Sequence, residues 1–183
     1  MAGMSKRLHL GDIHFDIENE LINITSGSKI LDQISYHDIS KSDWGYVYEK
    51  YVGQVLRERG YIVEYNGLSK GFNDAGVDLI AQRDNKDFLI QCKFIKKSTI
   101  GKQKIEQILY KASSMIASYC KRGKPTFCLV IPSISQSFGK KYKKGKVTYP
   151  IADYFLSINN IQSATKFEIF EIEMPYFKDK HLL

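Results

Sequence analysis

The chain has few cysteines and no long apolar run, and both absences narrow the classes of protein to which it can belong. Only three of its 183 residues are cysteines, Cys92, Cys120 and Cys128, and no pair of them has the C-x2-C spacing of a zinc site. We therefore expect neither a zinc centre nor a disulfide framework. No stretch approaches the roughly 18 consecutive apolar residues of a membrane span, and Met1 to Leu10 lack the apolar run of a signal peptide. A cytoplasmic location without a membrane partner is the resulting expectation.

The composition is that of a globular protein with an excess of positive charge. Hydrophobic residues make up 43% of the chain and charged residues 26%, which excludes wholesale disorder. A length of 183 residues suits one domain with a real core, with at most a small appendage. The formal charge of +7 and the isoelectric point near 9.2 favour a polyanionic partner.

We divide the chain into an N-terminal strand and loop extension, residues 1–41, and a main domain, residues 42–183. Within the extension, alternating apolar residues predict a strand or hairpin over 8–17, and residues 18–40 suggest a short helix and a loop. The main domain has a core over 42–131, followed by a basic loop and C-terminal elements over 132–183.

The first strong helical pattern runs from Asp43 to Arg59. Its apolar residues recur at helical spacing: Trp44, Val47, Tyr48, Tyr51, Val52, Val55 and Leu56. Glu49 lies at the edge of this apolar stripe, with Gly45 and Gly53 one turn before and after it. These two positions without side chains leave room for a strand, a metal ion or a phosphate. Glu49 could equally be an ordinary exposed glutamate, and the helix alone does not decide between the two.

Strand and helix patterns then alternate along the chain. In order, they are strand 61–65, strand 77–82, strand 87–94, helix 103–121, strand 126–131, helix 151–160 and strand 166–173. Residues 68–75 predict a polar loop suited to lie close to a ligand. A strand, a helix and a strand buried on both faces imply a right-handed parallel crossover, so a mixed sheet flanked by helices is expected.

Three polar residues are predicted to meet at the ends of two central strands. Asp78 opens the first strand, and a tight hairpin can bring the amide oxygen of Gln91 beside its carboxylate. Because strand side chains alternate, Gln91 and Lys93 share a face, and Cys92 points into the core with its backbone carbonyl left as a further ligand. Such oxygen ligands suit Mg²⁺, and Lys93 would stand beside the attacking water of a phosphodiester hydrolysis. The alternative is a functionless surface ion pair between Asp78 and Lys93.

These residues resemble the catalytic motif of Mrr-type restriction endonucleases in the PD-(D/E)xK nuclease superfamily, in the variant whose middle acid is replaced by glutamine. The resemblance extends over ordered blocks between about residues 42 and 131: 48–53, 56–63, 71–81 and 89–93. It implies a restriction-endonuclease-like α/β core and DNA cleavage that depends on Mg²⁺, with Mn²⁺ as a substitute.

By position, the resemblance assigns metal binding to Asp78 and Gln91, catalysis to Lys93 and a supporting acid to Glu49. Together with the carbonyl of Cys92, the predicted metal ligands are Asp78, Gln91, Cys92 and Glu49, and Glu49, Asp78, Gln91 and Lys93 are the predicted catalytic residues. Asp74 matches a second acid of the family, and Gln107 matches a helix glutamine of related enzymes. Two departures stand out: Gln91 is neutral, and residues 1–41 hold no counterpart of the winged-helix module that such domains often carry.

Lysines gather at two places where DNA contacts are predicted. Five lie within residues 140–146, interleaved with Tyr142, in a loop that could grip phosphates and stack on bases or could simply be solvated. The predicted DNA-binding residues are Lys96, Lys97, Lys102, Lys104, Lys140, Lys141, Lys143 and Lys144.

Three functions follow from these observations. The first is an endonuclease of the restriction type that acts on DNA, with a homodimer and a separate recognition subunit as candidate assemblies. The second is a structure-selective nuclease that resembles junction resolvases, although these usually keep an acid at the position of Gln91. The third is a catalytically silent nucleic-acid-binding module on the same fold.

Overall fold

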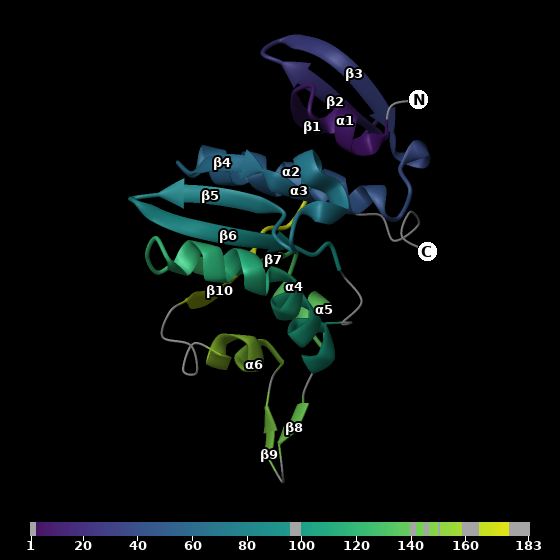
Figure 1. Cartoon of the computed structure of the whole chain (residues 1–183). Coiled ribbons are helices and arrows are strands. Elements are labelled where there is room, and N and C mark those ends of the chain that lie inside the picture. The colour runs from purple at the N-terminus through teal and green to yellow at the C-terminus, as the bar shows by residue number, and fades with distance from the viewer. Residues whose placement is uncertain are drawn as a thin grey trace.

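The computed structural model describes residues 3–95, 100–139, 142–144, 147–149, 151–158 and 165–175. At its centre is a five-stranded sheet with strand order β10-β7-β6-β5-β4 (Figure 1). Its strands are β4 (Ile62–Tyr65), β5 (Leu79–Arg83), β6 (Lys86–Cys92), β7 (Thr126–Ile131) and β10 (Lys166–Glu171). β4, β5 and β6 are antiparallel neighbours, whereas β7 runs parallel to both β6 and β10. The predicted mixed α/β fold and the parallel crossover are confirmed.

Helices cover both faces of this sheet. They are α2 (Asp43–Glu58) on one face, and α4 (Lys102–Cys120) with α6 (Ile151–Ser157) on the other (Figure 1). The alternation of β7 divides its side chains accordingly, because Cys128 and Val130 pack toward α2, whereas Phe127 and Leu129 pack toward α4 and α6. In the described ranges, no helix combines the length and the apolar character needed to cross a membrane.

The N-terminal region is more regular than its sequence suggests. It contains α1 (Met4–Leu8) and a three-stranded antiparallel sheet of β1 (Asp12–Asp16), β2 (Leu21–Ser26) and β3 (Lys29–Ser35), followed by the 3₁₀ turn η1 (Tyr36–Asp38). The expectation of a short helix and a loop between residues 18 and 40 is therefore wrong over most of its length. Ile22 and Ile24 both point into the core that α2 also lines. Burial of every second side chain therefore stabilises β2 as a strand although its other positions are largely polar.

Two predicted loops also contain regular structure. Residues 68–75 were expected as a loop, but α3 (Asn66–Lys70) and the 3₁₀ turn η2 (Gly71–Asn73) occupy most of them. Within 132–149 the chain forms α5 (Ile134–Ser137) and a separate hairpin of β8 (Tyr142–Lys144) and β9 (Val147–Tyr149). The other predicted helices and strands are confirmed to within a few residues at their ends.

Candidate active site

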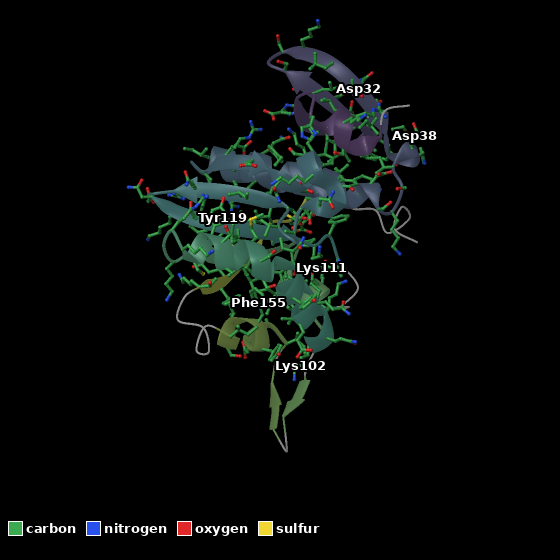
Figure 2. The ribbon with its side chains drawn as sticks, in the orientation of Figure 1. Asp32, Asp38, Lys102, Lys111, Tyr119 and Phe155 are labelled. Atoms are coloured by element: carbon green, nitrogen blue, oxygen red, sulfur yellow. The ribbon has the colours of Figure 1, made fainter. Side chains whose placement is uncertain are left out.

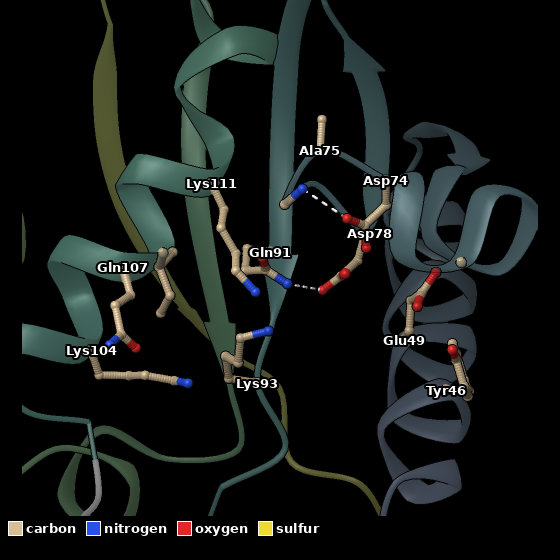
Figure 3. A pocket seen from close by; sticks show the side chains of 13 residues that line it. Tyr46, Glu49, Asp74, Ala75, Asp78, Gln91, Lys93, Lys104, Gln107 and Lys111 are labelled. Carbon is tan, nitrogen blue, oxygen red and sulfur yellow. Dashed lines mark hydrogen bonds between the residues drawn. The ribbon is translucent and has the colours of Figure 1, made fainter.

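A cavity of about 410 Å³ lies beside the ends of β5 and β6, between α2 and α4 (Figure 3). Carboxylates, amides and lysines from four separate segments of the chain share it. It is lined by Tyr46, Glu49, Gly71, Asp74, Ala75, Gly76, Asp78, Gln91, Lys93, Lys104, Gln107, Ile108 and Lys111.

Asp78 is fixed by its backbone and by its side chain. It immediately precedes β5, where its N–H donates to the carbonyl of Ile90 at 2.8 Å and its carbonyl accepts from Gly67 N–H at 2.7 Å. Its Oδ2 accepts from the backbone N–H of Cys92 at 2.6 Å and also from the side-chain amide of Gln91. With 9% of its surface exposed, the carboxylate has little freedom to turn away from the cavity.

Glu49 projects from α2 and is held by the first turn of α3. Its Oε1 accepts from the backbone N–H of Leu68 at 2.9 Å, and only 4% of the residue is exposed. Gly67 makes this possible, because a Cβ there would stand 2.8 Å from both carboxylate oxygens of Glu49. The alternative of an ordinary exposed glutamate is therefore wrong.

Of the two helix glycines around Glu49, Gly53 has a packing role, whereas a Cβ at Gly45 would meet nothing within 4 Å. A Cβ at Gly53 would lie 2.4 Å from the ring of Tyr65 in β4, so Gly53 lets the strand pack against α2. Gly45 has open space around it. The room beside the Glu49 carboxylate comes from Gly67 instead.

Burial raises the pKa of both carboxyl groups. The pKa of Glu49 rises to about 9, chiefly through desolvation and then through the negative charge of Asp78. Desolvation also raises the pKa of Asp78, to about 6, against the lowering effect of the nearby Lys93 ammonium and the Cys92 N–H donor. Two buried acids that resist ionisation together are suited to a cation that would offset their charge.

Gln91 lies beside Asp78, but its amide faces the other way from our expectation. Its Nε2 donates to Asp78 Oδ2 and lies 3.5 Å from the backbone carbonyl of Cys92. A donor toward the carboxylate is the arrangement that a hydrogen bond without a metal ion favours. For Gln91 to offer Oε1 as a ligand, its amide group would have to turn over.

The loop before Asp78 is a tight turn held by a buried asparagine. Asn66, fully buried, donates from Nδ2 to the carbonyls of Asp74 at 2.9 Å and Val77 at 2.6 Å. Asp74 Oδ1 in turn accepts from Gly76 N–H at 2.7 Å (Figure 3). The turn passes through left-handed backbone at Ala75, φ 54°, and Gly76, φ 70°, and it carries Asp74 to the cavity wall.

Lysines form the opposite side of the cavity. Lys93 follows β6, and α4 presents Lys104 and Lys111 from one face together with Gln107 (Figure 3). α4 comes this close because Gly76 has no side chain, since a Cβ there would stand 2.7 Å from Cβ of Lys111 and 2.9 Å from its backbone.

Part of the chain that forms this cavity matches a known protein family. Residues 41–122 match the family model Mrr_cat, described as "Restriction endonuclease". This segment is an Mrr-type restriction endonuclease catalytic domain. A solved structure titled "Crystal Structure of Protein of Unknown Function AF1548" is similar with 16% identity and a TM-score of 0.40, over 68% of this chain and 57% of that one. No curated protein matches the chain.

The Mrr-type segment contains every residue that we predicted for catalysis and metal binding. Glu49, Asp74, Asp78, Gln91, Lys93 and Gln107 all line the cavity. As predicted, the Cys92 side chain lies in the core, on the α2 side of the sheet, and its carbonyl is near the Gln91 amide. The assignment of Gln91 to Lys93 as a Q-x-K motif stays a prediction.

The donor set of this catalytic domain fits a hard divalent cation. In the described ranges, no cluster of three or more His, Cys, Asp or Glu residues suited to a metal ion is found. Mg²⁺ does not require such a cluster, because it usually takes one or two carboxylates and completes its shell with water and substrate oxygens. Glu49 and Asp78 supply that number, and desolvation raises the pKa of both despite the nearby Lys93 ammonium.

The predicted DNA-binding lysines have different positions. Lys104 lines the cavity, whereas Lys102 pairs with Glu106 at 3.8 Å and lies over the ring of Tyr154, toward the β8 and β9 end of the molecule (Figure 2). Four others fall outside the described residues, namely Lys96, Lys97, Lys140 and Lys141, and the side chains of Lys143 and Lys144 in β8 are likewise not described.

Three residues of the Mrr-type site were not predicted from the sequence. Lys111 had a signal, since it lies four residues after Gln107 and seven after Lys104 on one helix face. Tyr46 lies one turn before Glu49, which also places it on the cavity side of α2. Asn66 gave no signal beyond that of a turn, because its role depends on contacts with Asp74 and Val77.

Proposed function

We propose that the protein is a Mg²⁺-dependent endonuclease that hydrolyses DNA phosphodiester bonds in restriction or defence. One observation carries the proposal: two buried carboxylates and three lysines, from separate elements, line a single cavity within an Mrr-type catalytic domain. Mn²⁺ is expected to replace Mg²⁺, since both accept carboxylate and carbonyl oxygens.

Glu49 and Asp78 would hold the ion, joined by the carbonyl of Cys92 and by Gln91 once its amide has turned over. When bound, the ion supplies Lewis-acid polarisation of the phosphate. The backbone N–H groups of Leu68 and Cys92 keep the two carboxylates in place before substrate arrives, so little reorganisation is needed at the moment of reaction.

The lysines would bind the substrate and stabilise the developing charge. Lys93 shares the cavity with Asp78 and Gln91, so its ammonium can orient the attacking water and offset negative charge on the phosphorane-like transition state. Lys104 and Lys111, both exposed on α4, can bind the phosphate oxygens on the far side. Cutting both strands of a duplex takes two sets of these side chains, and a second copy of the chain would supply the second set.

The test is cleavage of supercoiled plasmid in Mg²⁺ by the wild type, Asp78→Asn and Lys93→Met. We expect the wild type to cleave and both variants to lose at least about 100-fold in rate, the usual cost of removing a preorganised electrostatic group. Asp84→Asn and Lys86→Met are matched controls at the exposed β5–β6 turn, and Asn suits the left-handed backbone of Asp84.

Equal activity in Asp78→Asn and the wild type would contradict this site. A wild type that binds DNA but does not cleave methylated or unmethylated plasmid would favour the silent nucleic-acid-binding module. Cleavage confined to a four-way junction would favour the junction-resolvase-like alternative.

A further inference from the structure

A second cavity, of about 830 Å³, adjoins the candidate active site on the side away from α4. It lies between α1, the start of α2 and α3, and it shares Tyr46 and Gly71 with the first cavity. The two cavities meet at Tyr46 and Gly71, and we refer to them together as the groove. α1 lies outside the residues that match the Mrr-type catalytic domain.

The charge of this extension suits a polyanion. Its lining includes Lys6 from α1 and Lys70 from α3, both exposed, and also His9, against one carboxylate, Asp43. Asp43 is already engaged, since its Oδ2 accepts from the hydroxyl of Ser40 at 2.6 Å. The groove thus has lysines at both ends, Lys104 and Lys111 on α4 and Lys6 and Lys70 here, with the acids between them.

The wall formed by α1 is attached to the same turn that holds the catalytic acid. Ser5 Oγ donates to the carbonyl of Leu68 at 2.6 Å, and the N–H of that same residue donates to Glu49. Leu8 of α1 is fully buried in the core that α2 also lines, and this burial anchors α1. The α1 backbone that carries Lys6 is therefore held at a fixed place relative to Glu49.

We infer that this groove binds the DNA strand next to the scissile phosphate, with Lys6 and Lys70 on backbone phosphates and Tyr46 against a sugar or base. The inference rests on the proposed function. A strand cleaved at an internal phosphate must leave the site in two directions, and α4 lines only one of them. Figure 3 shows Tyr46 and Glu49 on one side of the cavity, Lys104 and Gln107 on the other, and Lys93 between them. An aromatic ring at the junction of two basic segments is the arrangement that binds successive nucleotides.

The test uses full-length protein with Asp78→Asn, which blocks cleavage, and measures the affinity for a short DNA duplex by fluorescence anisotropy at several salt concentrations. Adding Lys6→Gln and Lys70→Gln should make the negative slope of log K against log salt less steep by up to about 1.8. Each phosphate that is no longer neutralised reduces the magnitude of the slope by about 0.9. The matched control, Lys29→Gln with Lys86→Gln, removes two exposed lysines that line neither cavity and should leave the slope unchanged. Tyr46→Ala should weaken binding by about 5-fold or more without changing the slope.

An unchanged slope in Lys6→Gln/Lys70→Gln, with a circular dichroism spectrum and melting temperature like those of the control, would overturn the inference. Displacement of DNA by poly-glutamate at equal charge concentration would also overturn it, because an acidic peptide would then be the better occupant. The two proposals fail separately. A wild type that does not cleave in Mg²⁺ contradicts the nuclease, whereas the salt slope of the Asp78→Asn protein reports on the groove alone.

Discussion

The acidic and the basic sides of the cavity are held in different ways. Glu49 and Asp78 are 4% and 9% exposed, and each accepts a hydrogen bond from a backbone N–H. Lys104 and Lys111 line the cavity from α4 and are exposed. A small divalent cation demands fixed ligand geometry, whereas a lysine acts on a phosphate as a flexible point charge. Tight packing is therefore concentrated around the acids, and the basic side is left adaptable.

The largest effect on stability is expected where the two sides meet, at Gly76. Gly76→Ala forces a Cβ against α4 at Lys111 and places it on left-handed backbone at φ 70°. We expect a loss of about 2–4 kcal/mol in the free energy of unfolding, measured by urea denaturation. Gly123→Ala is the matched control, because Gly123 has open space around it and should change the stability by less than about 0.5 kcal/mol. Equal stability of the two variants would show that α4 does not press on the Asp74–Asp78 turn.

A smaller and opposite effect is expected on the acidic side from Glu49→Gln. Burial raises the pKa of Glu49 in the folded state to about 9. The free energy of unfolding is therefore highest below the ordinary pKa of a glutamate and falls as the pH rises from there toward about 9. Without metal ions at pH 7, the variant should therefore be more stable than the wild type by about 1–3 kcal/mol, and the difference should vanish near pH 4. Thermal or urea denaturation across this pH range checks it. A pH-independent difference would mean that Glu49 is already ionised in the folded protein.

The smallest structural effect is expected on the basic side from Lys104→Gln. Because Lys104 is exposed, its loss should change stability by less than about 0.5 kcal/mol. The substitution should still lower the salt slope of DNA binding by about 0.9, the value for one phosphate that is no longer neutralised. Lys121→Gln, beyond the end of α4 and outside the cavity, is the control. If the salt slope of Lys104→Gln equals that of the wild type, Lys104 does not contact a DNA phosphate.

The sequence predicted the elements that carry a strong period. The apolar residues of α2 and α4 recur every three or four positions, and β7 is almost wholly apolar, so these elements and the parallel crossover between β6 and β7 were predicted within a few residues. In the N-terminal sheet, β1 lies within the strand predicted over 8–17, whereas β2 and β3 were missed because polar residues such as Asn23 and Asp32 hide their alternation.

The residues of the site were predicted from the sequence, but their burial and hydrogen bonding were not. Local spacing brought Asp78, Gln91 and Lys93 together, since they belong to one hairpin. The burial of Glu49 depends on Gly67 and Leu68, which come from a turn about 20 residues later, and a spacing pattern does not encode that contact. The orientation of the Gln91 amide likewise depends on which hydrogen-bonding groups surround it in the folded chain.

The central claim is that the buried acids hold Mg²⁺, and titration calorimetry of Mg²⁺ binding at pH 7 in buffers of different ionisation enthalpy tests it most directly. Glu49 keeps its proton at this pH because its pKa is raised, and it must lose that proton to bind a cation. We predict Mg²⁺ binding with release of about one proton per ion in the wild type, and loss of that release in Glu49→Gln. No binding, or binding whose heat does not depend on the buffer, would contradict the claim.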